Sequence, residues 1–167
     1  VPFNQDSNDL QFNQFGLTGC LNIYKSNFEN TNIDVKNGQC EDSLNIVKSK
    51  GSIKNIIVIS SFTDGIDIDF SDVYIDNILV SNSGNDCLDV SSGQYIVSQL
   101  TVNTCGDKGL SVGEKSIMKI NNLNIKNSLV GFSSKDSSIL SINNAVLKSS
   151  DTCYEAKQKK QEFGGGK

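Results

Sequence analysis

Three successive stretches decide the fold: Thr63-Asp64-Gly65-Ile66-Asp67-Ile68-Asp69, Gly84-Asn85-Asp86-Cys87-Leu88-Asp89-Val90 and Gly106-Asp107-Lys108-Gly109-Leu110-Ser111-Val112. In each, polar and charged residues precede an apolar–polar–apolar triplet, and each triplet begins 22 residues after the previous one. A fixed period of this size is typical of a solenoid, in which each repeat buries its apolar side against its neighbours. The chain is therefore interpreted first as a set of stacked coils.

The triplet recurs along the chain in both directions from this stretch. Its inward pairs are Leu21/Ile23, Leu44/Ile46, Ile66/Ile68, Leu88/Val90, Leu110/Val112, Phe132/Ser134 and Tyr154/Ala156. A second strand follows at Ile33/Val35, Ile56/Val58, Ile78/Val80, Leu100/Val102, Leu123/Ile125 and Ala145/Leu147. An amide residue precedes it, at Asn32, Asn55, Asn77, Gln99, Asn122 and Asn144. Stacked amides at a corner can hydrogen-bond from coil to coil, as in other cross-β stacks.

These patterns predict an all-β protein, a right-handed parallel β-helix of about seven coils with a 22-residue period. Its apolar residues are mainly Ile, Val and Leu, with no Trp and a single Pro, and Asn, Ser, Gly and Asp fill the corners. The leucine-rich repeat has an overlapping period, but its Leu-x-x-Leu-x-Leu-x-x-Asn consensus and a helical 3.6-residue pattern are both missing.

Two segments are expected. Residues 1–16 carry no repeat, hold Phe3, Phe12 and Phe15, and are predicted to form an N-terminal cap. Residues 17–167 are predicted to form the β-helix. No capping helix follows its last coil, so we expect either that the native chain continues or that another chain stacks there. Val1 is not an initiator Met, and the chain is interpreted as a mature product or an excised piece.

The cysteines follow the repeat. Cys20 and Cys87 each stand just before a triplet, and Cys40 and Cys105 come 20 and 18 residues later. One turn of a solenoid brings such positions to roughly 5 Å, which suits a disulfide. We predict bridges Cys20–Cys40 and Cys87–Cys105, and hence an extracytoplasmic location, secreted or at the cell surface. The remaining Cys153 is free, paired with a missing segment or buried; we expect it buried.

Charge and composition exclude several functions. The net charge is −4 and the chain has no His, which excludes histidine catalysis and His-ligated metals within it. No basic patch indicates a nucleic-acid partner, and no apolar run is long enough to span a membrane.

Strand alternation predicts one continuous outward face. Its central column is Asn22, Asn45, Asp67, Asp89, Ser111, Ser133 and Glu155. A second column, two residues before each triplet, is Asp42, Asp64, Asp86 and Lys108, and a third, after the triplet, is Asp69, Ser91, Gly113, Lys135 and Lys157. Carboxylates one strand spacing apart raise one another's pKa and suit a shared proton or a cation. Alternatively, Asp and Asn only shape and solvate the corners.

Part of this face resembles a known enzyme family. In polygalacturonases, which are right-handed β-helix hydrolases, Asn-Thr-Asp-Gly is followed by Asp-Asp-Cys, Gly-His-Gly-Leu-Ser-Ile-Gly and Arg-Ile-Lys. The corresponding stretches here are Thr63-Asp64-Gly65, Asn85-Asp86-Cys87, Lys108-Gly109-Leu110-Ser111-Val112-Gly113 and Ser133-Ser134-Lys135. The resemblance implies Asp64 and Asp86 as the water-activating carboxylates and Lys135 as a contact to a substrate carboxylate. It also implies pairing of Cys87 with a cysteine near Cys105.

The departures from that family concern its catalytic residues. The family's general acid is replaced by Asn85, its His by Lys108 and its Arg by Ser133. Inverting hydrolysis needs an acid and a base on opposite sides of the bond. Competent galacturonase chemistry is therefore not expected, unless Asp107 serves as the acid with a well-raised pKa.

A second resemblance covers roughly residues 44–167. Gly106-Asp107-Lys108-Gly109, Ser111-Val112-Gly113-Glu114, Ser134-Lys135-Asp136 and Lys159-Lys160-Gln161-Glu162-Phe163-Gly164 are similar to segments of secreted or surface β-helix repeat proteins of microbes. This resemblance implies the fold and the location, and no established reaction.

The leading hypothesis is an extracytoplasmic domain whose acidic face binds a polysaccharide or surface glycan. Since this face repels a bare polyuronate, we expect either a bridging Ca²⁺ or a neutral or amino sugar. The candidate metal ligands are Asp67, Asp69 and Asp89, and the candidate glycan contacts are Asp67, Asp89, Ser111, Glu114 and Asp136.

Two other functions stay open. One is an active polysaccharide hydrolase or lyase that uses the catalytic candidates Asp64, Asp86, Asp107, Lys108 and Lys135. The other is a structural module of a surface protein, fibre or phage spike that stacks end to end through its C-terminal coil. Aromatic residues are rare, and Tyr24, Tyr74, Tyr95 and Tyr154 are scattered around the repeat, which argues against a sugar-stacking platform.

Overall fold

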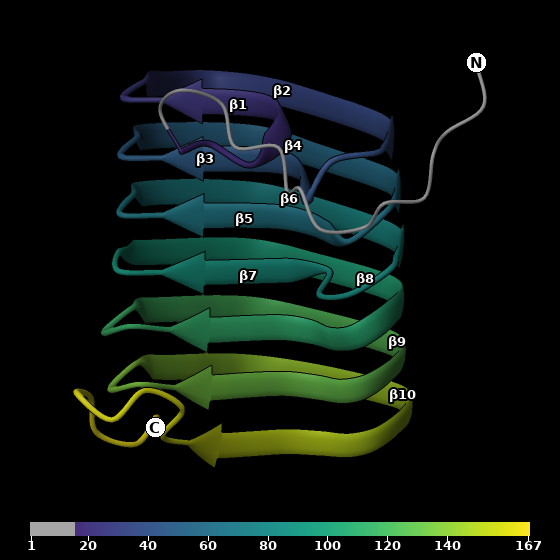
Figure 1. Cartoon of the computed structure of the whole chain (residues 1–167), viewed down its shortest axis with the longest axis vertical. Helices are drawn as coiled ribbons and strands as arrows, with labels where there is room; N and C mark the ends of the chain where they lie inside the picture. The colour runs from purple at the N-terminus through teal and green to yellow at the C-terminus, as the bar shows by residue number, and fades with distance from the viewer. Residues whose placement is uncertain (1–15) are drawn as a thin grey trace.

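The computed structural model describes residues 16–167 as a right-handed parallel β-helix of about six turns (Figure 1). In Figure 1 the front strands run leftward and the back strands rightward as the chain descends, which sets the handedness. The predicted fold class is confirmed, and the coil number is close to the seven expected. The predicted N-terminal cap lies outside the described residues except for Gly16.

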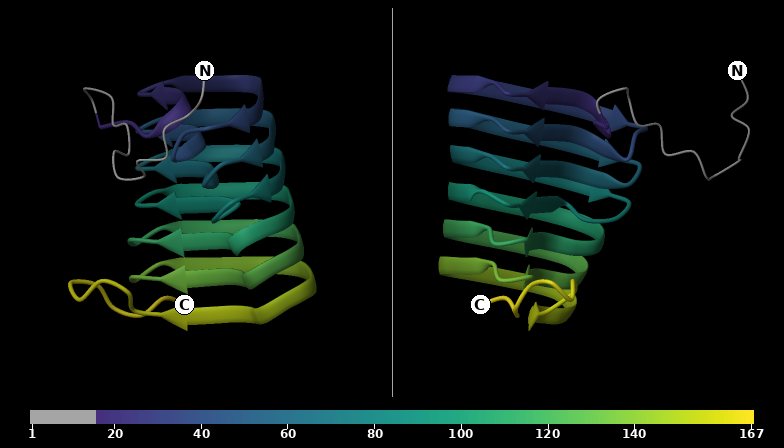
Figure 2. Two further views of the ribbon diagram at one scale, coloured as in Figure 1. Left: turned by 45° about the vertical axis from the view of Figure 1, so that its right-hand side comes forward. Right: turned by 60° about the vertical axis from the view of Figure 1, so that its left-hand side comes forward.

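The ten strands within residues 16–167 belong to one sheet in which neighbouring strands are parallel. The strands of the upper coils are β1 (Gly19–Tyr24), β2 (Asn27–Gly38), β3 (Asp42–Val47), β4 (Lys50–Ser61), β5 (Asp64–Asp69), β6 (Asp72–Ser83) and β7 (Leu88–Ser91). In the lower coils the back and front strands of each coil are continuous and form a single long strand. These long strands are β8 (Gln94–Gly113), β9 (Ile117–Lys135) and β10 (Ile139–Lys157). Figure 2 shows the stacked coils from two other directions.

The register places the predicted triplets in one stack. Leu44 pairs with Ile66, Ile66 with Leu88 and Leu88 with Leu110, and all four side chains are fully buried. The second strand behaves likewise, with Ile56, Ile78 and Leu100 in one buried column. The core therefore consists of several stacked columns of mainly branched aliphatic side chains, in which each residue pairs with its equivalent in the next coil.

Two corners in each coil have a left-handed backbone. The first corner column is Lys25, Lys48, Phe70, Ser92, Glu114 and Asp136, and the second is Asn37, Ser60, Asn82, Thr104, Asn127 and Ser149, all with positive φ. Asn and Asp tolerate this conformation better than most residues, whereas it is unfavourable for a bulky aromatic ring. Phe70 is therefore an exception in its column.

The predicted amide ladder is present on the exposed side of the second strands. The Asn55 amide donates to Asn32 Oδ1 (2.6 Å) and the Asn77 amide to Asn55 Oδ1 (3.2 Å). Lower down, the Asn144 amide donates to Asn122 Oδ1 (3.2 Å). These bonds run along the helix axis and link the coils through their side chains.

Both predicted disulfides are confirmed. Cys20 bridges to Cys40 and Cys87 to Cys105, with Cα–Cα distances of 5.3 and 5.4 Å. The prediction that Cys153 is buried was wrong, because this residue is exposed. It lies in β10, whose side chains have no further rung beneath them over most of the strand, so even Tyr154 is 44% exposed.

The last ten residues fold back against the start of β10. Lys167 N–H donates to Ser138 O (3.0 Å), and Leu140 N–H donates to Lys167 O (2.9 Å). Gly166 packs so closely on Ser134 that a Cβ there would approach the Ser134 carbonyl oxygen to 2.1 Å. This C-terminal tail (residues 158–167) thus covers one end of the lowest rung.

Candidate functional site

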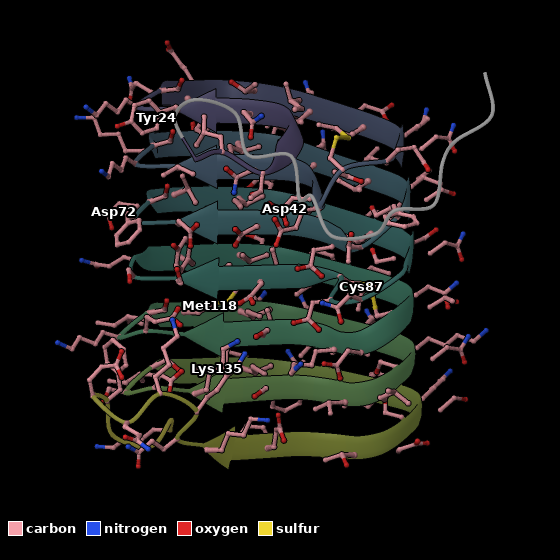
Figure 3. The ribbon with its side chains drawn as sticks, in the orientation of Figure 1. Tyr24, Asp42, Asp72, Cys87, Met118 and Lys135 are labelled. Carbon is pink, nitrogen blue, oxygen red and sulfur yellow. A yellow bond between two sulfur atoms is a disulfide. The ribbon has the colours of Figure 1, made fainter. Side chains whose placement is uncertain are left out.

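The acidic face lies on the front strands of the upper and middle coils. We use this name for Asp42, Asp64, Asp67, Asp69, Asp86 and Asp89. Strand pairing puts Asp42 beside Asp64, and Asp67 beside Asp89, in neighbouring coils. The central column continues in register from Asn45 above to Ser111 below, as the sequence predicts, but these two side chains are buried, so the predicted outward face is not exposed there. Figure 3 shows these front strands with their side chains, with Asp42 and Lys135 labelled.

At the corner that precedes the triplet, two carboxylates each hold the backbone of the coil below. Asp64 Oδ1 accepts the Asp86 N–H (2.9 Å) and the Asn85 side-chain amide (2.7 Å). Asp86 Oδ1 accepts the Lys108 N–H (2.9 Å). Burial raises the pKa of both Asp64 and Asp86. One oxygen of each predicted water-activating carboxylate is therefore used to join adjacent coils.

Lys108 and Asp107 form an ion pair beside this corner. The Lys108 ammonium also lies 3.5 Å from Asp86 Oδ1. Partial burial disfavours the Lys108 charge, but the bonds to Asp107 and Asp86 outweigh it and raise its pKa. Asp107, the sequence-based candidate for a replacement acid, is thus committed to Lys108 rather than free to face a substrate.

The central column holds carboxyl groups that keep their protons to unusually high pH. Burial, with the adjacent Asp69 charge, raises the pKa of Asp67 far above its usual range. Burial also raises the pKa of Asp89 to about 6, although Lys135 opposes the shift. The Asn45 amide donates to Asp67 Oδ2 (3.1 Å), and Asp69 accepts from the Ser91 hydroxyl. At mildly acidic pH this column presents hydrogen-bond donors as well as acceptors.

Lys135 crosses two coils to reach this column. Its ammonium donates to Ser111 Oγ (2.7 Å) and lies 3.5 Å from Asp89 Oδ2, and the side chain is only 6% exposed. The path crosses Gly113, where a Cβ would meet Lys135 Cε at 2.8 Å. The missing side chain at Gly113 therefore lets Lys135 lie against the face and neutralise part of its charge.

Replacement of Gly113 by alanine is expected to lift Lys135 away from Asp89. The added methyl group occupies the space of a flexible side chain, so Lys135 moves while the strand stays in place. The pKa of Asp89 then rises above its present value of about 6, because its opposing positive charge is lost. A carboxyl ¹³C NMR titration measures this shift.

Lys135→Met is the matched control, since it removes the same charge without the added methyl group. It is expected to shift the pKa of Asp89 in the same direction. An Asp89 titration that stays the same in both variants would contradict the assigned role of Lys135.

Glu114 and Asp136 belong to a different environment from the acidic face. Glu114 pairs with the Lys160 ammonium (2.6 Å). Asp136 is fully buried, and its Oδ1 accepts the N–H groups of Lys159 (2.7 Å) and Lys160 (2.8 Å). Glu114 and Asp136, two of the five predicted glycan contacts, thus bind the C-terminal tail. The structure does not bring them together with Asp67 and Asp89.

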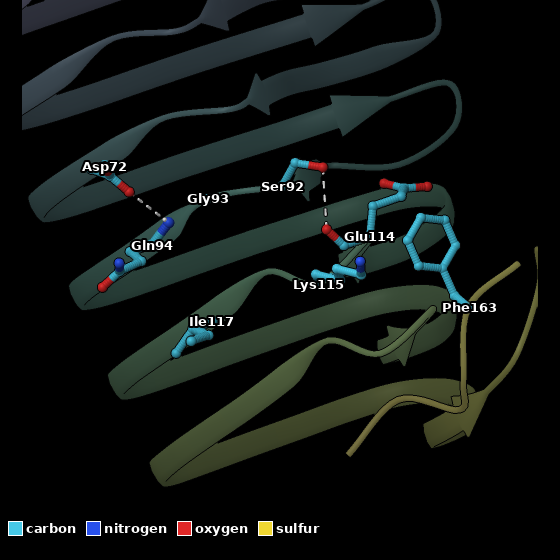
Figure 4. Close-up of a pocket in the computed structure, with 8 residues that line it drawn as sticks. All are labelled: Asp72, Ser92, Gly93, Gln94, Glu114, Lys115, Ile117 and Phe163. Atoms are coloured by element: carbon cyan, nitrogen blue, oxygen red, sulfur yellow. Dashed lines mark hydrogen bonds between the residues drawn. The ribbon is translucent and has the colours of Figure 1, made fainter.

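A cavity of about 540 Å³ lies at the corner that follows the front strands, below Phe70 in the same corner column (Figure 4). It is lined by Asp72, Ser92, Gly93, Gln94, Glu114, Lys115, Ile117 and Phe163. Lys115 Nζ lies 5.6 Å from the Phe163 ring centroid, and Asp72 accepts the Gln94 N–H (3.1 Å). The tail supplies Phe163, far from residues 72–117 in the chain, so the sequence pattern alone did not reveal this cavity.

Residues missed by the sequence interpretation include aromatic side chains at the two ends of β5. Phe62 is 69% exposed two residues before the strand, and Phe70 is 58% exposed directly after it. Of the scattered tyrosines, Tyr95 is buried, with its hydroxyl 2.7 Å from Ser91 O, whereas Tyr24 is exposed. The sequence interpretation did not consider Phe62 or Phe70, and it treated Tyr24 and Tyr95 only as tyrosines scattered around the repeat.

Within residues 16–167, no group of three or more His, Cys, Asp or Glu side chains is arranged to hold a metal ion. Asp67, Asp69 and Asp89 are nevertheless neighbours on one face. Calcium binding by these three residues remains a prediction. The same part of the chain contains no helix that is long and apolar enough to cross a membrane.

Comparison with protein-family models, with curated proteins and with solved structures finds no match to this chain. The resemblance to pectin-degrading hydrolases therefore depends on the short motifs alone, and the structure supports it at the level of a parallel β-helix.

Proposed function

We propose that this protein is an extracytoplasmic β-helix module that binds a neutral or amino-sugar glycan along its acidic face. The observation that carries the proposal is the central column, where the partly exposed Asp67 and Asp89 stack in parallel register between the buried side chains of Asn45 and Ser111. Its rungs are about 4.8 Å apart, close to the length of one sugar residue in an extended glycan. The two disulfides are consistent with an extracellular setting.

The protonation of the face supports a neutral sugar. A protonated carboxyl group both donates and accepts a hydrogen bond, as a sugar hydroxyl does. The raised pKa values of Asp67 and Asp89 keep such groups available at mildly acidic pH. An anionic sugar gains less binding energy from this face, because Lys135, the lysine that reaches the central column, already binds Asp89 and Ser111.

Binding is proposed in preference to hydrolysis. Asp64 and Asp86 each bind a backbone N–H of the next coil, and Asn85 donates to Asp64 instead of supplying an acidic proton. Asp107 is ion-paired with Lys108. A hydrolase needs both an acid and a base, and these contacts favour an adhesive role.

The test is calorimetric titration with hexasaccharides of glucose, N-acetylglucosamine and galacturonate, each in EDTA and in CaCl₂. We expect a neutral or N-acetylated hexasaccharide to bind without calcium, and no reducing sugar to be released. The Asp67→Ala/Asp89→Ala double variant should weaken binding about tenfold or more, which corresponds to about 1.4 kcal/mol, the order of a lost hydrogen-bonding pair.

Asp34→Ala is the matched control, since Asp34 is an exposed aspartate on the opposite side, in β2. It should leave binding unchanged. Failure of every hexasaccharide to bind would refute the proposal. Binding of galacturonate only in CaCl₂, lost in the double variant, would replace the neutral-sugar version with the calcium-bridged one.

A further inference from the structure

The edge of the acidic face where its strands end carries two exposed aromatic side chains. Tyr24 is the last residue of β1 and is 44% exposed, and Phe70 directly follows β5 and is 58% exposed. Strand pairing puts Tyr24 beside Val47 and Val47 beside Asp69, the residue before Phe70. The two rings therefore belong to coils two rungs apart, roughly 10 Å at the spacing of a parallel sheet.

Lys48 lies between the two rings. Its ammonium is 6.0 Å from the centroid of Tyr24 and 6.0 Å from that of Phe70. A second ammonium, from Lys25, lies 5.1 Å from the Tyr24 centroid. We call Tyr24, Lys48 and Phe70 the aromatic edge. It combines two apolar ring surfaces with a central hydrogen-bond donor, all exposed to solvent.

Phe70 occupies an unfavourable backbone conformation with little burial in return. Its φ is 49°, in the left-handed region, which is unusual for a bulky side chain. The equivalent corner residues Lys48 and Ser92 are polar. An aromatic residue that is both strained and largely exposed contributes little to the core, and such outliers concentrate at functional sites.

We propose that Tyr24 and Phe70 are stacking subsites for alternate sugar residues of a glycan that runs along the helix axis. This inference depends on the proposed function and identifies its ligand as an extended β-linked chain. Two rungs correspond to about one disaccharide unit of such a chain. The C–H faces of pyranose rings pack on aromatic rings, and Lys48 donates to hydroxyls of the sugar between them, beside the carboxyl groups of Asp67 and Asp69.

Phe70→Asn is the first test variant, because Asn tolerates a positive φ and removes the ring. In titrations with the glucose or N-acetylglucosamine hexasaccharide that binds the native protein, we expect affinity to fall about tenfold. The melting temperature should stay the same or rise, since the backbone strain is relieved. Tyr24→Ala should weaken binding to a similar extent.

The length of the ligand gives a second measurement. The native protein should bind the tetrasaccharide and hexasaccharide more tightly than the disaccharide, because longer chains reach both rings. This gain should disappear in Phe70→Asn. Phe62→Ala is the matched control, since Phe62 is an even more exposed phenylalanine at the other end of β5, and it should bind like the native protein.

The outcomes separate this inference from the proposed function. If Phe70→Asn and Tyr24→Ala bind normally while Asp67→Ala/Asp89→Ala does not, the aromatic edge is refuted and the acidic face retained. A loss in Phe62→Ala as large as in Phe70→Asn also refutes the aromatic edge. If the native protein binds none of these oligosaccharides, both proposals fail.

Discussion

Mild acidification is expected to raise the melting temperature of this protein. Burial raises the pKa of Asp42 to about 7 and that of Asp89 to about 6, and it raises the pKa of Asp67 further. In the unfolded chain these groups titrate near 3.9. Between about pH 4 and pH 7 the folded protein thus binds more protons than the unfolded one, so its stability falls as pH rises.

The size of this effect follows from the partly buried carboxyl groups. Because solvent screens them in part, we expect a combined gain of about 2 kcal/mol from pH 8 to pH 5. For a domain of this size that corresponds to roughly 5 °C in melting temperature. Differential scanning calorimetry in matched ionic strength measures it.

The variant Asp67→Asn/Asp89→Asn tests the origin of the effect. It removes two of the buried charges, so its melting temperature at pH 8 should exceed that of the native protein, with little difference at pH 4. Asp34→Asn, on the opposite side of the helix, should keep the native pH dependence. A native melting temperature that falls steadily from pH 8 to pH 5 would contradict the raised pKa values of Asp42, Asp67 and Asp89.

Removal of the Cys87–Cys105 disulfide is expected to cost about 3 kcal/mol of unfolding free energy, because the bridge closes an 18-residue separation and restricts the unfolded chain. Both cysteines are buried in the middle of the stack, so their replacement by alanine affects the cooperative core. The melting temperature should fall by roughly 9 °C. Urea unfolding of Cys87→Ala/Cys105→Ala measures the loss.

The first disulfide is the matched comparison. Cys20–Cys40 spans a similar separation but joins the uppermost described coil, where Cys20 is exposed and one side of the rung has no neighbour described. Since terminal coils open locally before the whole domain unfolds, Cys20→Ala/Cys40→Ala should cost clearly less. Equal losses from both pairs would indicate that the stack unfolds as one unit from end to end.

Much of the fold was predictable because a solenoid has few degrees of freedom. A 22-residue period and strand alternation together set which residues stack and which face outward. The column that joins Asp67 to Asp89 and Ser111 follows from these two rules, and the structure reproduces its register, although Ser111 is buried. The disulfides follow by the same reasoning, because one turn returns the chain to a neighbouring position.

The contacts made by the ends of side chains could not be predicted from the repeat. Periodicity assigns Lys135 to a column but does not show that its ammonium reaches Asp89, because that reach depends on the space above Gly113. Likewise, the hydrogen bond from Asp86 N–H to Asp64 depends on the local corner geometry. These contacts decide whether a carboxyl group is free or already engaged, and thus what the face can do.

The sequence by itself therefore determined the stack: its period, its inward and outward columns, and the pairing of its cysteines. Only the tertiary structure decided the state of the site. Burial set the pKa values of Asp67 and Asp89, the folded tail engaged Asp136, and the corner conformation exposed Phe70 near Tyr24. The physical reason is that repeat order is a property of the chain, whereas burial and side-chain reach depend on neighbours from other coils.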